Sequence, residues 1–85
     1  MGNSCIILYG TTWCGDCHRS QKFLEKHEIP YEFVNIDQDR EGEQYVRKVN
    51  KGMRSVPTIL FQDGSTLVEP SNTQLAQKLN IDAAS

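Results

Sequence analysis

The sequence predicts an α/β fold in which three helices flank a four-stranded mixed sheet. Three observations support this prediction: short apolar runs alternate with helical patterns over the first fifty residues, Asp63-Gly64 marks a tight turn between two further runs, and prolines separate the segments. A strand–helix–strand unit implies a parallel strand pair, whereas a hairpin adds antiparallel strands. The 85 residues suffice for a single domain, expected to span residues 1–85.

The elements are expected in the order β-α-β-α-β-β-α. Their predicted bounds are residues 5–9, 14–28, 31–36, 39–50, 58–61, 66–68 and a last helix from residue 71. Pro30 should stop the first helix and Gly52 the second. Ser71 and Gln74 have the spacing of a capping box and should open the third. The residues expected to be buried share apolar character: Cys5, Phe23, Phe33, Tyr45, and a helix stripe of Gly42, Val46, Val49 and Met53.

Composition excludes several classes of partner. The formal charge is −2, so nucleic acid is not expected as a partner, and the basic cluster at residues 47–54 is interpreted as a solvated helix face. The longest apolar run, residues 6–9, is too short to span a membrane, and no secretion signal opens the chain. Three cysteines do not make a secreted disulfide framework. We therefore expect a cytoplasmic monomer.

The chemistry is expected in the segment Thr12-Trp13-Cys14-Gly15-Asp16-Cys17-His18. The segment follows a predicted strand and opens a predicted helix, where free backbone N–H groups and the helix dipole favour an anion such as a thiolate. We predict Cys14, in an exposed first turn of the helix, as the attacking thiol and Cys17, one helical turn deeper, as the thiol that resolves a mixed disulfide. A Cys-x-x-Cys pair beside a βαβ pattern is typical of a redox pair.

Other functions of the same segment remain open at this point. Cys-x-x-Cys-His also fits c-type haem attachment, with Met53 as a second axial ligand of an electron carrier. A structural zinc site needs four ligands, and beyond the cysteine pair only Cys5, His18 and His27 are available, with no second Cys-x-x-Cys. Two buried structural cysteines are a further alternative. A phosphate-binding loop is excluded, because Asp16-Cys17 replaces the required Lys-Ser/Thr. Asp37 and Asp39 are expected to cap the second helix.

The chain resembles the glutaredoxins of the thioredoxin superfamily, most closely the mycoredoxin-like ones. The resemblance lies in residues 12–17, in Arg54-Ser55-Val56-Pro57-Thr58, and in residues 61–67 leading into Pro70-Ser71. It implies a thioredoxin-like fold and a thiol–disulfide oxidoreductase with no bound cofactor. It also implies a cis peptide bond before Pro57. An iron–sulfur-bridged dimer, which some glutaredoxins form, stays open.

The resemblance also implies a substrate site. Thr12 and Trp13 would line its rim, although Trp13 could instead anchor the loop; the Val56 backbone beside Pro57 would pair with the substrate, and Ser71 would bind a carboxylate. The implied substrates are mixed disulfides of a low-molecular-weight thiol, or protein disulfides, with a thiol or disulfide reductase as electron donor. Thr11, Asp16 and Val68-Glu69 depart from the pattern of glutathione-using members. The thiol could therefore be glutathione or mycothiol.

Overall fold

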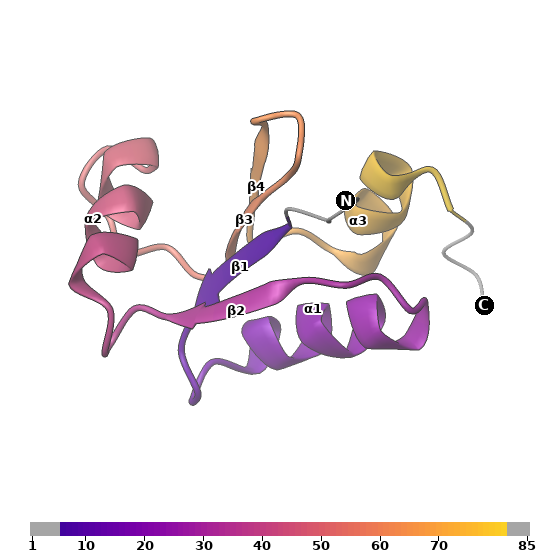
Figure 1. Cartoon of the computed structure of the whole chain (residues 1–85), viewed down its shortest axis with the longest axis horizontal. Helices are drawn as coiled ribbons and strands as arrows, with labels where there is room; N and C mark the ends of the chain where they lie inside the picture. The colour runs from indigo at the N-terminus through magenta and orange to yellow at the C-terminus, as the bar shows by residue number, and fades with distance from the viewer. Residues whose placement is uncertain (1–5, 82–85) are drawn as a thin grey trace.

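The computed structural model of the chain describes residues 6–81 and confirms the predicted order of elements (Figure 1). The expectation for Cys5 falls outside these residues. The elements are β1 Ile7–Gly10, α1 Gly15–Lys26, β2 Glu32–Asn35, α2 Arg40–Val49, β3 Thr58–Leu60, β4 Thr66–Val68 and α3 Asn72–Leu79.

The strands form one mixed sheet in the order β2-β1-β3-β4. β1 runs parallel to β2, with Leu8 opposite Phe33, and antiparallel to β3, with Leu8 opposite Ile59. β3 and β4 form the predicted antiparallel hairpin, whose turn includes Gly64 at a φ of +89°. β1 is therefore an inner strand, and α1 begins just beyond its carboxyl end.

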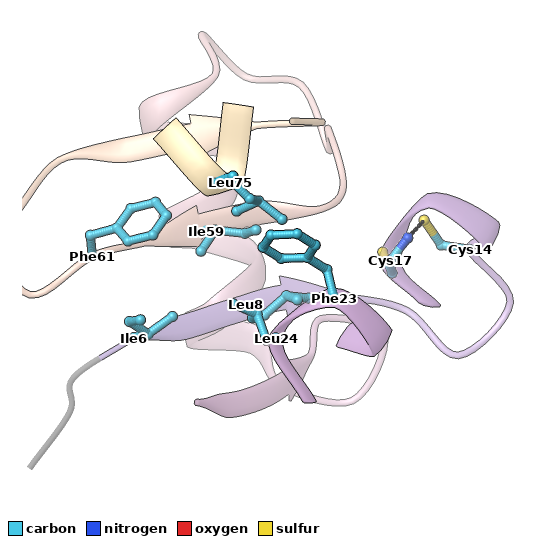
Figure 2. Close-up of a cluster of buried hydrophobic side chains, with 10 residues drawn as sticks. Ile6, Leu8, Cys14, Cys17, Phe23, Leu24, Ile59, Phe61 and Leu75 are labelled. Carbon is cyan, nitrogen blue, oxygen red and sulfur yellow. Dashed lines mark hydrogen bonds between the residues drawn. The ribbon is translucent and has the colours of Figure 1, made fainter. Parts of the chain in front are cut away.

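One face of the sheet packs against α1 and α3. Leu8 and Ile59 from the sheet, Leu24 from α1 and Leu75 from α3 are fully buried in one cluster (Figure 2). Burying each such side chain contributes about 1.5–3 kcal/mol before the entropy cost of ordering it. The cluster extends to Cys14 and Cys17, so the candidate redox pair is part of the core.

The other face of the sheet carries α2, which Figure 1 shows on the opposite side from α3. The rings of Tyr9 and Tyr45 lie 4.9 Å apart between centroids, and Gly42 approaches so closely that a Cβ there would lie 2.8 Å from Val34 Cγ1. Val46 is fully buried beside this contact. Two layers of helices thus enclose the sheet.

Four burial predictions differ from the structure. Val49 is 38% exposed and Met53 is 63% exposed, so the apolar stripe of α2 ends at Val46. The reason is that α2 itself ends at Val49, and Met53 follows a tight turn through Gly52, whose amide donates to Arg47 O at 2.6 Å. Phe33 and Tyr45 are only partly buried, whereas Phe23 is buried as predicted.

The predicted stop of α1 is also misplaced. The helix ends at Lys26, and Glu28 takes a left-handed φ of +58° that lets the Ile29 amide donate to Leu24 O at 2.9 Å. This closure is a Schellman-type cap, so the chain has left the helix before Pro30. The predicted capping box of α3 is confirmed: Ser71 Oγ accepts from the Gln74 amide, and Gln74 Oε1 accepts from the Ser71 amide. None of the helices within residues 6–81 is long and apolar enough to span a bilayer.

Gly10, the last residue of β1, permits the close approach of Cys17. A Cβ at position 10 would lie 2.6 Å from Cys17 Sγ and 3.2 Å from Cys17 Cβ. We expect Gly10→Ala to lower the free energy of unfolding by about 1–3 kcal/mol, because the buried sulfur or the strand must shift. Urea denaturation of the reduced protein measures this change.

Gly15→Ala is the matched control, because a Cβ at position 15 has no neighbour within 4 Å. An alanine in the first turn of α1 should leave stability unchanged or raise it by about 0.4–1 kcal/mol. Equal stability of the two variants would show that Gly10 does not define the space around Cys17.

Candidate active site at the start of α1

Cys14 lies at the junction between β1 and α1. It is the N-cap residue of α1, with extended backbone angles, and its Sγ accepts a hydrogen bond from the Cys17 amide at 3.1 Å (Figure 2). A cap is usually an oxygen of Ser, Thr, Asp or Asn; here the acceptor is sulfur. The amide and the positive end of the helix dipole both stabilise negative charge on this atom. The N-terminal end of α1 therefore forms a site that favours negative charge on the Cys14 sulfur.

Cys17 lies one turn further along α1 and is fully buried between the helix and Gly10. Burial, followed by the hydrogen bond with Cys14 and the charges of Cys14 and Asp16, raises the pKa of Cys17 to about 12. The Thr11 backbone acts in the opposite direction by hydrogen bonding to the Cys17 sulfur. Cys17 is thus held as a neutral thiol in the reduced protein.

The Val56–Pro57 segment crosses the sheet end beside the cysteines. Its peptide bond is cis, as the family resemblance implies. Cys14 Sγ lies 3.9 Å from Val56 O, to which the thiol form can donate. This segment helps cover the sulfur: Cys14 is only 8% exposed, which corrects our expectation of an exposed first turn. Little of Cys14 is therefore in contact with solvent.

Trp13, which directly precedes Cys14, is exposed and held by a polar network. Its side chain is 68% exposed, yet its Nε1 donates to Asp37 Oδ2 at 2.9 Å, and Arg54 donates to the other carboxylate oxygen at 2.6 Å. The bond from Arg54, followed by that from Trp13, lowers the pKa of Asp37. Arg54 also pairs with Glu43 of α2 at 3.0 Å. The network fixes the indole in front of the cysteines.

The sequence did not predict this network of Trp13, Asp37 and Arg54. Asp37 was expected to cap α2, but only Asp39 does so, by accepting from the Gly42 amide at 2.9 Å. Arg54 was assigned to a solvated basic face. The sequence could have indicated the Trp13–Asp37 contact only through the predicted topology. Asp37 follows β2, which runs parallel to β1, so both strands end at the same end of the sheet. Residues that follow two such strands are brought together.

Thr12 and Ser71, two further residues predicted for the substrate site, are each held by local hydrogen bonds. Thr12 is exposed, and its carbonyl accepts from His18 Nε2 at 2.7 Å, which ties the loop to α1. Ser71 starts α3, and Arg19 of α1 reaches its neighbour, Pro70 O, at 3.4 Å. Both polar groups of Ser71, the amide and the hydroxyl, are already engaged with Gln74. A carboxylate bound at Ser71 would have to compete with the Gln74 side chain.

Metal ligands do not gather around the pair. In the described part of the chain no three His, Cys, Asp or Glu side chains are placed to hold one ion. The two cysteines are unpaired thiols in this structure.

The contrast between the two thiols predicts their reactivity. With a pKa of about 12, only about 0.01% of Cys17 is thiolate at pH 8, and its sulfur has no exposed surface. We expect iodoacetamide to modify Cys14 and to leave Cys17 unmodified in the reduced, folded protein between pH 7 and 10. Peptide mass spectrometry identifies the modified sulfur.

Unfolding in guanidinium supplies the control, because Cys17 should then react at the rate of an ordinary thiol. Modification of both cysteines at similar rates in the folded protein at pH 8 would contradict the assignment of unequal roles.

Comparisons with known proteins agree with this geometry. The glutaredoxin family model matches residues 6–65. Rv3198A, a Mycobacterium tuberculosis protein assigned to the glutaredoxins, is 40% identical over 79 residues, covering 93% of this chain and 94% of its own. Mycoredoxin 1 of Corynebacterium glutamicum is 34% identical over 74 residues, covering 87% and 91%.

Solved structures show the same fold. The glutaredoxin of Archaeoglobus fulgidus superposes with a TM-score of 0.72 at 24% identity, over 92% of this chain and 88% of its own. The comparisons give no support to the alternative of a haem or metal carrier. The chain belongs to the glutaredoxin family of thiol–disulfide oxidoreductases.

Proposed function

We propose that this protein reduces disulfides by thiol–disulfide exchange, with Cys14 as nucleophile and Cys17 as resolving thiol. The observation that carries the proposal is the hydrogen bond from the Cys17 amide to the Cys14 sulfur at the start of α1. It gives the first sulfur a stabilised anionic form and holds the second residue one turn behind.

The reaction would proceed in two exchanges. The Cys14 thiolate attacks one sulfur of the substrate disulfide, and the other substrate sulfur leaves as a thiolate that takes up a proton. Cys14 is then joined to the remaining half of the substrate in a mixed disulfide. Attack by Cys17 on the Cys14 sulfur releases that half as a thiol and leaves a Cys14–Cys17 disulfide, so that two electrons pass from the pair to the substrate.

The environment of Cys17 favours this order of events. Two of the effects that raise its pKa, the hydrogen bond and the charge of Cys14, disappear when Cys14 is tied up in the mixed disulfide. Burial and the Asp16 charge remain, and the hydrogen bond from the Thr11 backbone still stabilises the thiolate. Cys17 therefore becomes easier to deprotonate only after the substrate has been captured.

The surrounding residues would align the substrate. The half-buried Val56 presents its backbone beside the Cys14 sulfur and would pair with the substrate backbone, with the cis Pro57 fixing that segment. Trp13 and Thr12 would form the rim, and the start of α3 at Ser71 would receive a carboxylate.

The proposed substrates are mixed disulfides of glutathione or mycothiol and protein disulfides, reduced by a single-domain monomer in the cytoplasm. A reducing compartment suits this chemistry, because the pair must be returned to the dithiol form by a thiol or a disulfide reductase. The relative named mycoredoxin 1 supports a small thiol as cosubstrate.

Two substitutions separate the roles of the cysteines. We expect Cys14→Ser to abolish all turnover, because the remaining sulfur of the pair, that of Cys17, is fully buried and cannot meet a substrate disulfide. Cys17→Ser should still remove a small thiol from a mixed disulfide but should lose the reduction of protein disulfides, which needs both sulfurs. Steady-state assays with the two substrate types measure the difference, and Cys5→Ala should retain both activities. Loss of de-thiolation in Cys17→Ser would contradict the single-cysteine route.

The electron source is identified by a direct comparison. The oxidised protein is mixed in turn with glutathione, a mycothiol mimic and a thioredoxin reductase, and the return of the free thiols is followed over time. The proposal expects one of the two small thiols to reduce the pair fastest, by about tenfold or more, since exchange depends on recognition of the attacking thiol as well as on its chemistry. Reduction only by the reductase would remove the small-thiol part of the proposal.

A further inference from the structure

The ion pair between Asp37 and Arg54 closes a ring of contacts that contains the Cys14 sulfur. Trp13 precedes Cys14 in the chain and donates from Nε1 to Asp37 Oδ2 at 2.9 Å. The other carboxylate oxygen, Asp37 Oδ1, accepts from Arg54 at 2.6 Å. Arg54 lies two residues before Val56, whose carbonyl oxygen is 3.9 Å from the Cys14 sulfur. Cys14 and the segment proposed to align the substrate are thus joined through this ion pair.

The Arg54 guanidinium is held by two carboxylates from different parts of the chain. Besides Asp37, which follows β2, it bonds Glu43 of α2, with Nε 3.0 Å from Glu43 Oε2. Glu43 also pairs with Arg47 of the same helix at 3.1 Å. The hydrogen bond with Asp37 raises the pKa of Arg54, and the same bond lowers the pKa of Asp37, so both groups are charged at neutral pH. An isolated exposed ion pair contributes little, but a network of several charges restricts each of its members.

The rest of the Val56 segment is anchored to the sheet. Thr58 Oγ1 of β3 donates to Ser55 O at 2.8 Å, and the Glu69 amide, just after β4, donates to Pro57 O at 2.8 Å. These bonds tie the segment to the hairpin, whereas the pair of Arg54 with Asp37 ties it to the loops that follow β1 and β2. Breaking the pair would therefore loosen the segment on the side of Cys14.

The contact between the Val56 carbonyl and the Cys14 sulfur depends on the proton of the thiol. The thiol can donate to the carbonyl oxygen. A thiolate has no proton to donate, and its charge repels the negative end of the carbonyl dipole. The Val56 carbonyl would then move away from the attacking form of Cys14 unless its segment were held by other contacts. Arg54 and Asp37 supply such a contact, since their bond does not depend on the state of the sulfur.

We propose that Asp37 and Arg54 are positioning residues whose ion pair holds the Val56 backbone beside the Cys14 thiolate. The pair would thereby favour disulfides that carry a peptide backbone over small disulfides that lack one. An extended peptide can form main-chain hydrogen bonds with an exposed backbone segment, and a small alkyl disulfide cannot. This inference rests on the proposed function and names a determinant of substrate choice at the same site.

Two disulfides with the same leaving group test the proposal with the full-length reduced protein. One is a short peptide whose single internal cysteine is joined to pyridine-2-thiol, and the other is ethyl 2-pyridyl disulfide, which has no backbone. The Cys14 thiolate forms a disulfide with the peptide or ethyl sulfur, and the released pyridine-2-thiolate takes up a proton to give the thione, which is followed by its absorbance. Cys17 then attacks the Cys14 sulfur, releases the peptide or ethyl thiol with its proton and closes the Cys14–Cys17 disulfide. The ratio of the two rates is insensitive to the reactivity of Cys14 itself, because both reactions share the nucleophile and the leaving group.

We expect the ratio of the peptide rate to the ethyl rate to fall about three- to fivefold in Asp37→Asn and in Arg54→Gln. The double variant should show no further fall, since either change opens the same ring. Asp37→Asn leaves an oxygen that can accept from Trp13 but removes the charge that pairs with Arg54. Asp63→Asn is the matched control, because it removes the exposed pair with Lys78 at 2.8 Å and should keep the ratio. Circular dichroism confirms the folding of all variants.

The outcomes separate the positioning role from the proposed function. An unchanged ratio in both single variants would overturn the positioning role alone. An equal fall in Asp63→Asn would also overturn it, and so would a fall in the double variant equal to the product of the two single effects, because the two residues would then act independently. If neither disulfide converts the unaltered protein to its Cys14–Cys17 disulfide, the proposed function is wrong together with the positioning role.

Discussion

The hydrogen bond from the Cys17 amide to the Cys14 sulfur organises the site, because it makes the proposed nucleophile and the helix cap the same atom. The first turn of α1 needs an acceptor for its free amides, and the sulfur supplies it. Any change that moves the helix start therefore moves the reactive sulfur with it. The core holds that start in place: Cys17 is buried against Gly10, and the Leu8–Leu24–Leu75 cluster continues from it. Stability and reactivity are linked at this one junction.

The fold was largely predictable because each element carries its own local signal. The Ser71–Gln74 capping box, the Asp63-Gly64 turn and the short apolar runs all act over a few residues, and all appear where expected. The predicted end of α1 and the predicted burial of Met53 were wrong because another local conformation ended the helix first. A left-handed Glu28 ended α1 ahead of Pro30, and the turn at Gly52 carried Met53 out of the apolar stripe. A glutamate does not indicate a left-handed conformation by its type, so the end of α1 at Glu28 could not be predicted from the residue.

Only the part of the site that consists of consecutive residues could be predicted from the sequence. Residues 12–18 predicted a redox pair, and the family resemblance added the cis bond before Pro57. The partners of Trp13 come from β2's end and from the loop after α2, which no periodicity connects. The cover over Cys14 and the approach of Gly10 to Cys17 likewise depend on packing between distant segments. Such contacts follow from the folded arrangement of the sheet and not from spacing.

The anchoring of Trp13 has a practical consequence. It is the only tryptophan of the chain, it directly precedes Cys14, and its indole nitrogen is held by Asp37 while most of the ring faces solvent. Its intrinsic fluorescence is therefore a built-in reporter of the redox pair, with no dye or label to attach. Formation of the Cys14–Cys17 disulfide places an efficient quencher next to the emitting ring, so oxidation, reduction and substrate docking can each be timed from light that the protein itself emits.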